Sequence, residues 1–263
     1  MTAVGPDPAG HDDVVAFVAK WRAREPEMAF AEVFCPRSQR GRFVLWGALV
    51  FEWREAALEL SDARPTQAKC GWWAEEAVRN AQGGPRHPLT VALAMPSLPW
   101  LPLARAMSAM ADEEAPRPVD HEAALASVSP LAHALVAIEA ALFEGPATDA
   151  GRRATAVHLL GERLRIGRET GDGGRIPLSL LARHGIVAAD LGDARGEPVL
   201  RDWARELAAA LPDQRPEACL YRRARTDFDA WYLGERAAGR TRRMRPLHAL
   251  FRAWRSARPG RPG

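Results

Sequence analysis

The chain has 263 residues, of which 47% are hydrophobic and 26% are charged, so it can bury one sizeable core and is too apolar to be disordered throughout. Its cysteines, Cys35, Cys70 and Cys219, are odd in number and lack metal-type spacing, which argues against a disulfide framework and a zinc site. The sequence also lacks a secretion signal and a run of ~18 uncharged apolar residues that could span a membrane. We therefore expect a cytoplasmic protein.

The formal net charge of +3 conceals an uneven distribution of charge. Residues 234–263 contain nine arginines and one acid, Glu235, which leaves about −5 on residues 1–233. The positive charge is therefore concentrated at the C-terminal end.

Apolar residues recur at helical spacing along the chain, and no β-type alternation lasts long enough to compete. Proline and glycine mark the boundaries, although Pro130 could either start a new helix or kink one. Helices are predicted from Asp12 or Asp13 to Pro26, from Pro36 to Pro65, from about Thr66 to Gly83, from Leu89 to Ala94, briefly within 96–120, from Glu122 to Phe143, and over 150–168, 177–184, 198–211, 216–238 and 245–257.

These elements predict an all-α fold with one domain over residues 1–263. Within it, residues 1–11 are expected to be a flexible N-terminus, residues 245–258 a basic amphipathic terminal helix, and residues 259–263 a flexible tail.

Several motifs resemble those of the squalene/phytoene synthases. They are Pro36–Arg40, Leu45-Trp46-Gly47-Ala48-Leu49, Glu52, Trp72-Trp73, the heptad from Gly84 to Thr90, Gly174-Arg175-Ile176-Pro177-Leu178 with Leu181, His184 and Gly185, and the tail from Arg245-Pro246-Leu247 to Ala253-Trp254-Arg255. Together they cover roughly residues 30–258, although about 96–150 match only in helical character. The resemblance implies the helical bundle of the isoprenoid-synthase type.

Enzymes of that family carry two Asp-rich clusters on facing helices, which hold the magnesium ions that neutralise a prenyl diphosphate. In the register of the motifs, the first cluster falls on Arg54, Glu55 and Leu58, and the second on Ile166 and Thr170. A guanidinium at one of these positions opposes magnesium. The resemblance therefore implies a divergent member without the Asp-rich clusters.

A branch of this superfamily that has also lost these aspartates assembles respiratory complex I. The stretch from Ala48 through Glu52 to Trp73 is similar to it. We hypothesise a pseudoenzyme that needs no cofactor and binds a protein partner or a prenyl- or lipid-like ligand.

The alternative is an active transferase that condenses farnesyl or geranylgeranyl diphosphate in isoprenoid, carotenoid or hopanoid biosynthesis. The residues that would hold Mg²⁺ in that case are Glu55, Glu59, Glu169 and Asp172, and those near the diphosphate are Arg40 and Arg175. Glu52, Glu55 and Glu59 share one helix face, and Glu162 and Glu169 lie two turns apart. The plainer interpretation is that these glutamates are solvated or paired with arginines such as Arg54.

The terminal helix has an apolar stripe of Leu247, Leu250, Phe251 and Trp254 flanked by arginines, which is typical of a helix on an anionic surface. The candidates for contact with the inner face of the cytoplasmic membrane are Arg245, Phe251, Arg252, Trp254 and Arg255. The alternative is a helix packed on the domain with its arginines reaching water. Nucleic acid is not favoured, because the aromatic residues do not alternate with the arginines.

Other conspicuous residues are expected to be structural. Trp46, Trp53, Trp72 and Trp73 recur at helical spacing, which favours the core. The histidines His87, His133, His158 and His184 have no acid or nucleophile at a telling spacing.

Overall fold

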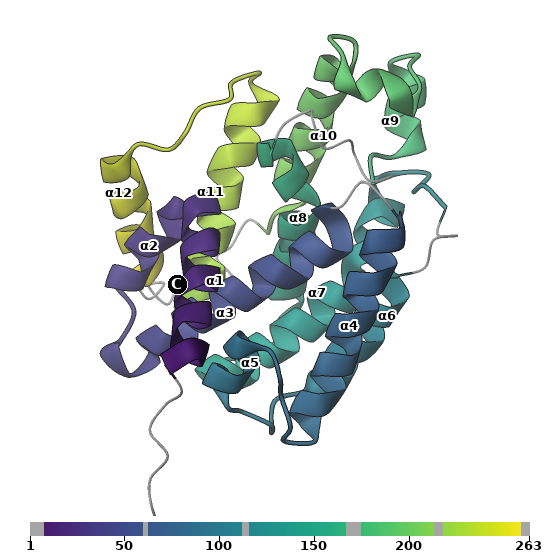
Figure 1. Cartoon of the computed structure of the whole chain (residues 1–263). Helices are drawn as coiled ribbons and strands as arrows, with labels where there is room; N and C mark the ends of the chain where they lie inside the picture. The colour runs from purple at the N-terminus through teal and green to yellow at the C-terminus, as the bar shows by residue number, and fades with distance from the viewer. Residues whose placement is uncertain (1–7, 60–62, 112–115, 167–174, 213–217, 259–263) are drawn as a thin grey trace, which may run out of the picture.

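The computed structural model describes residues 8–59, 63–111, 116–166, 175–212 and 218–258, and these ranges contain helices but no strand (Figure 1). The all-α prediction is confirmed. The elements are α1 (Pro8–Arg24), α2 (Pro26–Val33), α3 (Arg37–Arg54), the π-helix η1 (Glu55–Glu59), α4 (Ala63–Ala81), α5 (Pro88–Leu93), α6 (Trp100–Met110), α7 (His121–Phe143), α8 (Asp149–Ile166), α9 (Leu178–Arg183), the 3₁₀-helix η3 (Ala188–Gly192), α10 (Gly196–Ala210), α11 (Leu220–Ala237) and α12 (Pro246–Ala257).

Three boundaries differ from the expected ones, and all three involve prolines. Pro26 opens α2 at its first turn, where the missing N–H costs nothing, rather than only ending the helix before it. α4 begins at Ala63 and contains Pro65, which we expected to end the preceding helix. At Pro130, where the sequence left two possibilities open, α7 continues through the proline and no new helix starts. α1 begins at Pro8, inside the segment 1–11 that we expected to be flexible.

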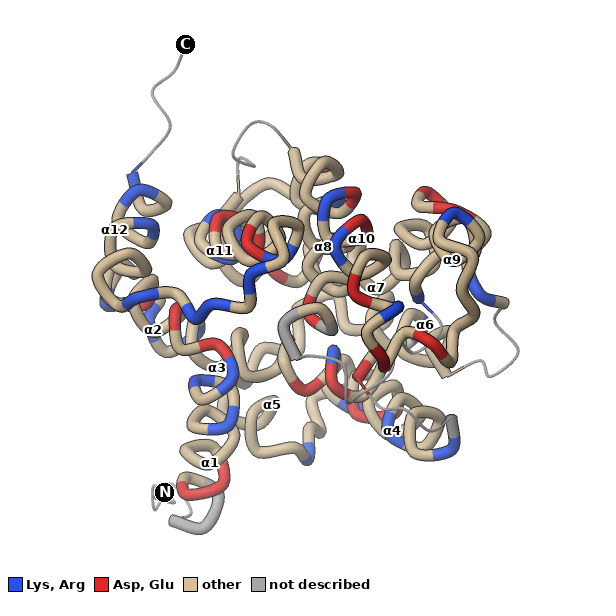
Figure 2. The backbone as a smooth tube through the Cα atoms, turned by 90° about the horizontal axis from the view of Figure 1, so that it is seen from above, with Lys and Arg blue, Asp and Glu red and all other residues tan. Residues whose placement is uncertain are grey.

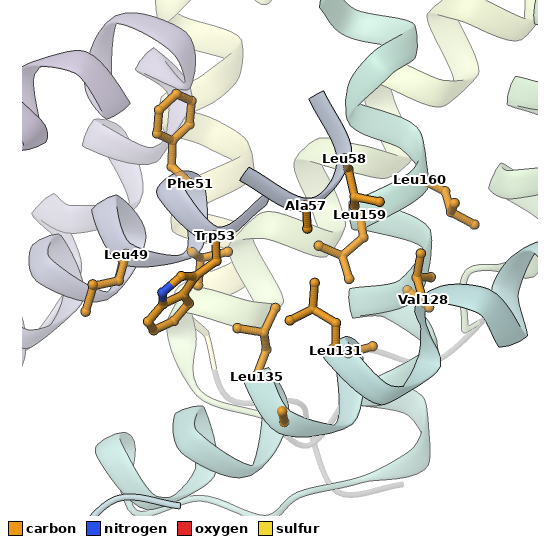
Figure 3. Close-up of a cluster of buried hydrophobic side chains, with 14 of the residues drawn as sticks. Leu49, Phe51, Trp53, Ala57, Leu58, Val128, Leu131, Leu135, Leu159 and Leu160 are labelled. Atoms are coloured by element: carbon orange, nitrogen blue, oxygen red, sulfur yellow. The ribbon is translucent and has the colours of Figure 1, made fainter. Parts of the chain in front are cut away.

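The core is built around α7, which packs between α6 and α8. Figure 3 shows Val128, Leu131 and Leu135 of α7 facing side chains of α8 and of the α3–η1 segment. Among the described residues, α7 is also the one helix long and apolar enough to cross a membrane, but 56% of its most apolar window is buried inside the bundle, as is common for core helices. Trp46, Trp53 and Trp73 are buried, whereas Trp72 is 46% exposed.

The turn before α5 is held by a buried carboxylate. Glu76 accepts hydrogen bonds at Oε1 from the backbone N–H of Arg86 (2.8 Å) and of His87 (2.9 Å) and from the hydroxyl of Thr90 (2.6 Å). His87 caps α5 by accepting the N–H of Leu89 at Nδ1 (3.2 Å). The motif from Gly84 to Thr90 therefore serves the scaffold.

His87 should make the protein less stable in mild acid. Burial lowers its pKa from the ordinary 6.5 to about 4, so the unfolded chain binds this proton at a higher pH than the folded one. The stability contributed by neutral His87 is complete above pH 6.5 and is lost as the pH falls towards 4, an expected loss of about 2 to 3 kcal/mol by pH 4.5. Urea unfolding at pH 7 and 4.5 measures it. His87→Asn, which keeps a capping oxygen, should remove that part of the pH dependence; an unchanged dependence would contradict the assignment.

Candidate functional site

The end of α3 changes from α-helical to π-helical geometry at Glu55, a change that often marks functional sites. η1 buries Ala57 and Leu58. Figure 3 shows these two side chains directed towards leucines of α7 and α8. Position 58 of the first cluster is therefore part of the apolar core.

Arg54 lies at the centre of a buried ion-pair network that joins Glu25, the residue between α1 and α2, to η1 and α8. Its side chain is 0% exposed. Nη1 is 2.7 Å from Glu25 Oε1, Nε is 2.9 Å from Glu59 Oε1, and Nη2 is 3.5 Å from Glu162 Oε1. One guanidinium thus pairs with carboxylates from three separate parts of the chain.

Arg54 keeps its charge in this position. Burial by itself lowers the pKa of the guanidinium, but the negative charges of Glu162, Glu25 and Glu59 outweigh burial and raise the pKa above its ordinary value. The positive charge is a fixed part of the structure.

A second buried arginine extends the network to α2 and α11. Arg225 Nη1 is 3.1 Å from both Glu25 Oε2 and Glu27 Oε1, and Nη2 is 3.0 Å from Asp229 Oδ1. Because Glu25 bonds to Arg54 with one oxygen and to Arg225 with the other, the two guanidinium groups form one continuous system.

His158 of α8 connects the two arginines through Asp229. Its Nε2 lies 2.9 Å from Nη1 of Arg54, and its Nδ1 lies 3.0 Å from Oδ2 of Asp229. Since a guanidinium can only donate, Nε2 accepts and Nδ1 carries the hydrogen that is donated to Asp229. Both ring nitrogens are therefore engaged, and the geometry fits a neutral imidazole.

A cavity of about 620 Å³ opens beside this network, within the roughly 300–1,000 Å³ typical of small-molecule sites. Three buried acidic residues of the network line it, namely Glu27, Glu162 and Asp229. Its apolar wall consists of Phe30, Val157, Gly161, Leu164, Tyr232, Leu233 and Met244. Its remaining charged lining is mostly arginine, namely Arg24, Arg236, Arg240, Arg242 and Arg243.

No protein-family model matches the sequence, and no curated protein matches it either. The structure is similar to the crystal structure of a dehydrosqualene synthase in complex with ligand, with a TM-score of 0.67 over 96% of this chain and 98% of that chain. The chain has the isoprenoid-synthase fold. The two sequences are 14% identical, so the likeness establishes the fold and leaves the activity open.

Within the isoprenoid-synthase fold, the described candidate magnesium ligands are paired with cations. Glu55 lies 2.6 Å from Lys20 Nζ, which also binds Glu52 at 3.0 Å. Glu59 binds Arg54 and, at 3.3 Å, Arg24. Glu169 and Asp172, like Thr170 of the second cluster, lie outside the described residues, and so does the side chain of Ile166.

The two candidate diphosphate ligands lie on different elements of the fold. Arg40 donates from Nη2 to the carbonyl oxygens of Val33 and Cys35 at the end of α2, both at 3.3 Å. Arg175 Nη1 lies 3.4 Å from the hydroxyl of Ser127 on α7. Neither contact involves the network around Arg54.

The described residues do not fit the magnesium that the fold family implies. Where a metal would need carboxylates around it, Arg54 stands among three of them, and a second cation beside the guanidinium would be repelled. Within the described ranges, no three His, Cys, Asp or Glu side chains are grouped so that they could hold a metal ion.

Sequence reasoning missed most of the network. Glu25, Arg225 and Asp229 did not stand out, because, apart from the Arg225–Asp229 pair four positions apart, their partners in the network lie between 29 and 200 positions away along the chain. The signal that the sequence did offer was Arg54 itself, an arginine between Glu52 and Glu55.

Proposed function

We propose that this chain is a non-catalytic protein of the isoprenoid-synthase fold that binds a lipid-like ligand with an anionic head group. The observation that carries the proposal is Arg54, a fully buried guanidinium at a position of the first cluster. It pairs with Glu25, Glu59 and Glu162, so these carboxylates already have a cation of the protein as their partner. A metal–diphosphate complex would have to bring its own cations to a place where a fixed guanidinium repels them.

The cavity supports the choice of ligand. Its apolar wall suits a hydrocarbon chain, since burying a methylene group contributes about 0.8 kcal/mol. Arg242 and Arg243 are exposed at the cavity and form no ion pair with any residue in the described ranges, so they can bind an anionic head group directly. An amphiphile would place its tail against α8 and α11 and its head at these arginines.

Ligand binding without magnesium is the test. In EDTA, farnesyl diphosphate at about a hundred-fold excess over its Kd should raise the melting temperature by about 5 °C, and farnesol or inorganic diphosphate by less. Arg242→Glu combined with Arg243→Glu should weaken binding about ten-fold or more. The matched control is Arg105→Glu, which changes an exposed arginine on α6.

The same protein and farnesyl diphosphate, with magnesium in place of EDTA, distinguish an enzyme from a binding protein. We expect that no diphosphate is released from farnesyl diphosphate. Magnesium-dependent release that Glu55→Ala abolishes would establish a prenyl transferase and refute the proposal. Absence of any shift with all three compounds would refute the lipid-like ligand and leave a protein partner as the explanation for the cavity.

A further inference from the structure

α12 packs on the bundle with its small residues and turns its large apolar residues outward. Ala249, Ala253 and Ser256 are buried against α2 and α11. The apolar stripe on the outward side is Leu247, 80% exposed, Leu250, 37%, Phe251, 55%, and Trp254, 36%. Figures 1 and 2 both show α12 at the edge of the bundle beside α2.

The position of α12 is fixed by ion pairs on its inner side. Arg252 Nη1 lies 3.2 Å from Asp227 Oδ2 of α11 and donates to the carbonyl oxygen of Asp227 at 3.0 Å, and Arg255 also pairs with Asp227. These contacts hold α12 against α11 in one orientation. In that orientation the apolar stripe is exposed.

We propose that the outward stripe of α12 (Leu247, Leu250, Phe251 and Trp254) docks on the anionic surface of a lipid bilayer. Phe251 and Trp254 form a continuous aromatic surface, with ring centroids 5.7 Å apart. Such side chains are favoured at the boundary between head groups and acyl chains, where an amphipathic helix lies in the plane of the membrane.

The charges around the stripe select an anionic surface. Arg242, Arg243 and Arg245 are exposed in the linker before α12, and Arg258 follows the helix with its guanidinium 3.5 Å from the ring centroid of Trp254. These four form no ion pair with any residue that the structure describes. Figure 2 shows the basic positions along this linker and α12. Each arginine near an anionic bilayer contributes about 1 kcal/mol to binding.

A second copy of the chain fits this face less well. A helix of 12 residues is about 18 Å long and about 10 Å wide, so the stripe offers on the order of 200 Å², against about 800 Å² per partner in a stable dimer. Two copies would also bring their arginines together. Docking on a bilayer, unlike dimer formation, requires neither a large complementary protein surface nor a second protein surface of opposite charge.

Cosedimentation of the full chain with vesicles tests the docking surface. The chain should bind phosphatidylcholine vesicles that contain about one third phosphatidylglycerol, bind pure phosphatidylcholine weakly, and lose binding as salt rises to about 0.5 M. Leu247→Ser with Phe251→Ser should weaken binding at least about ten-fold. The matched control is Val187→Ser, which changes a residue that is 64% exposed near α9 and should have no effect.

A second measurement does not depend on the folding of that variant. Brominated lipids should quench tryptophan fluorescence in the native chain and in Trp72→Phe, but much less in Trp254→Phe; Trp72 and Trp254 are 46% and 36% exposed. Equal quenching in the two variants, absence of binding to anionic vesicles, or self-association that the Leu247→Ser/Phe251→Ser variant loses would overturn the proposal. None of the four stripe residues lines the cavity, so the loss of vesicle binding in Leu247→Ser/Phe251→Ser reports on docking and not on the cavity, although Arg242 and Arg243 take part in both proposals.

Discussion

Replacing Arg54 by methionine should lower the free energy of unfolding by about 3 to 5 kcal/mol, because it removes the buried cation that Glu25, Glu59 and Glu162 share. Urea unfolding of the two proteins at pH 7 measures the difference.

Arg24→Met is the matched control for this prediction. Arg24 also pairs with Glu59, but its side chain is 44% exposed, so the change should cost about 1 kcal/mol or less. If both variants lost the same small amount of stability, the network would not be the buried, tightly coupled system that the distances indicate.

The fold could be predicted because helical periodicity and punctuation by proline and glycine are local signals. The helix from Glu122 to Phe143 appears where the sequence places it, and α3 begins directly after Pro36 as predicted, although Pro65 lies inside α4 rather than at the end of the helix before it. α2 was missed because it has eight residues and begins at the proline that we took only as an end. The π-helical turn at Glu55 has no comparable sequence pattern.

The chemistry of the centre depends on distant pairs, which a single sequence does not reveal. The sequence shows that Arg54 interrupts an acidic cluster, but its buried partners Glu25, at the start of α2, and His158, on α8, lie far away along the chain. The sequence did not reveal an acidic partner for His158, because Asp229 is 71 positions away. Similarly, the sequence shows the apolar stripe of α12, whereas only the packing shows that it faces outward.

The role of Gly47, a residue of one of the sequence motifs, is explained by the packing of α1 on α3. In the sequence it is a glycine inside Leu45-Trp46-Gly47-Ala48-Leu49, where it should weaken the helix. In the structure α1 crosses α3 there, and a Cβ atom at position 47 would lie 2.2 Å from Cζ2 of Trp21. The glycine lets the indole ring lie directly on the backbone of α3.

Gly47→Ala should therefore lower the free energy of unfolding by about 3 kcal/mol, although it adds a single methyl group to a helix. Trp21 is 0% exposed and donates from Nε1 to Glu25 at 3.0 Å, so the ring cannot move away without disturbing the Arg54 network.

The control is Gly41→Ala in the same helix, where a Cβ meets nothing within 4 Å and stability should rise by about 0.5 to 1 kcal/mol. Denaturant unfolding compares the two, and Trp21→Phe should reduce the penalty of Gly47→Ala, because the smaller ring retreats from the added methyl group. Equal stability of the two alanine variants would show that α1 and α3 are not in the close contact described.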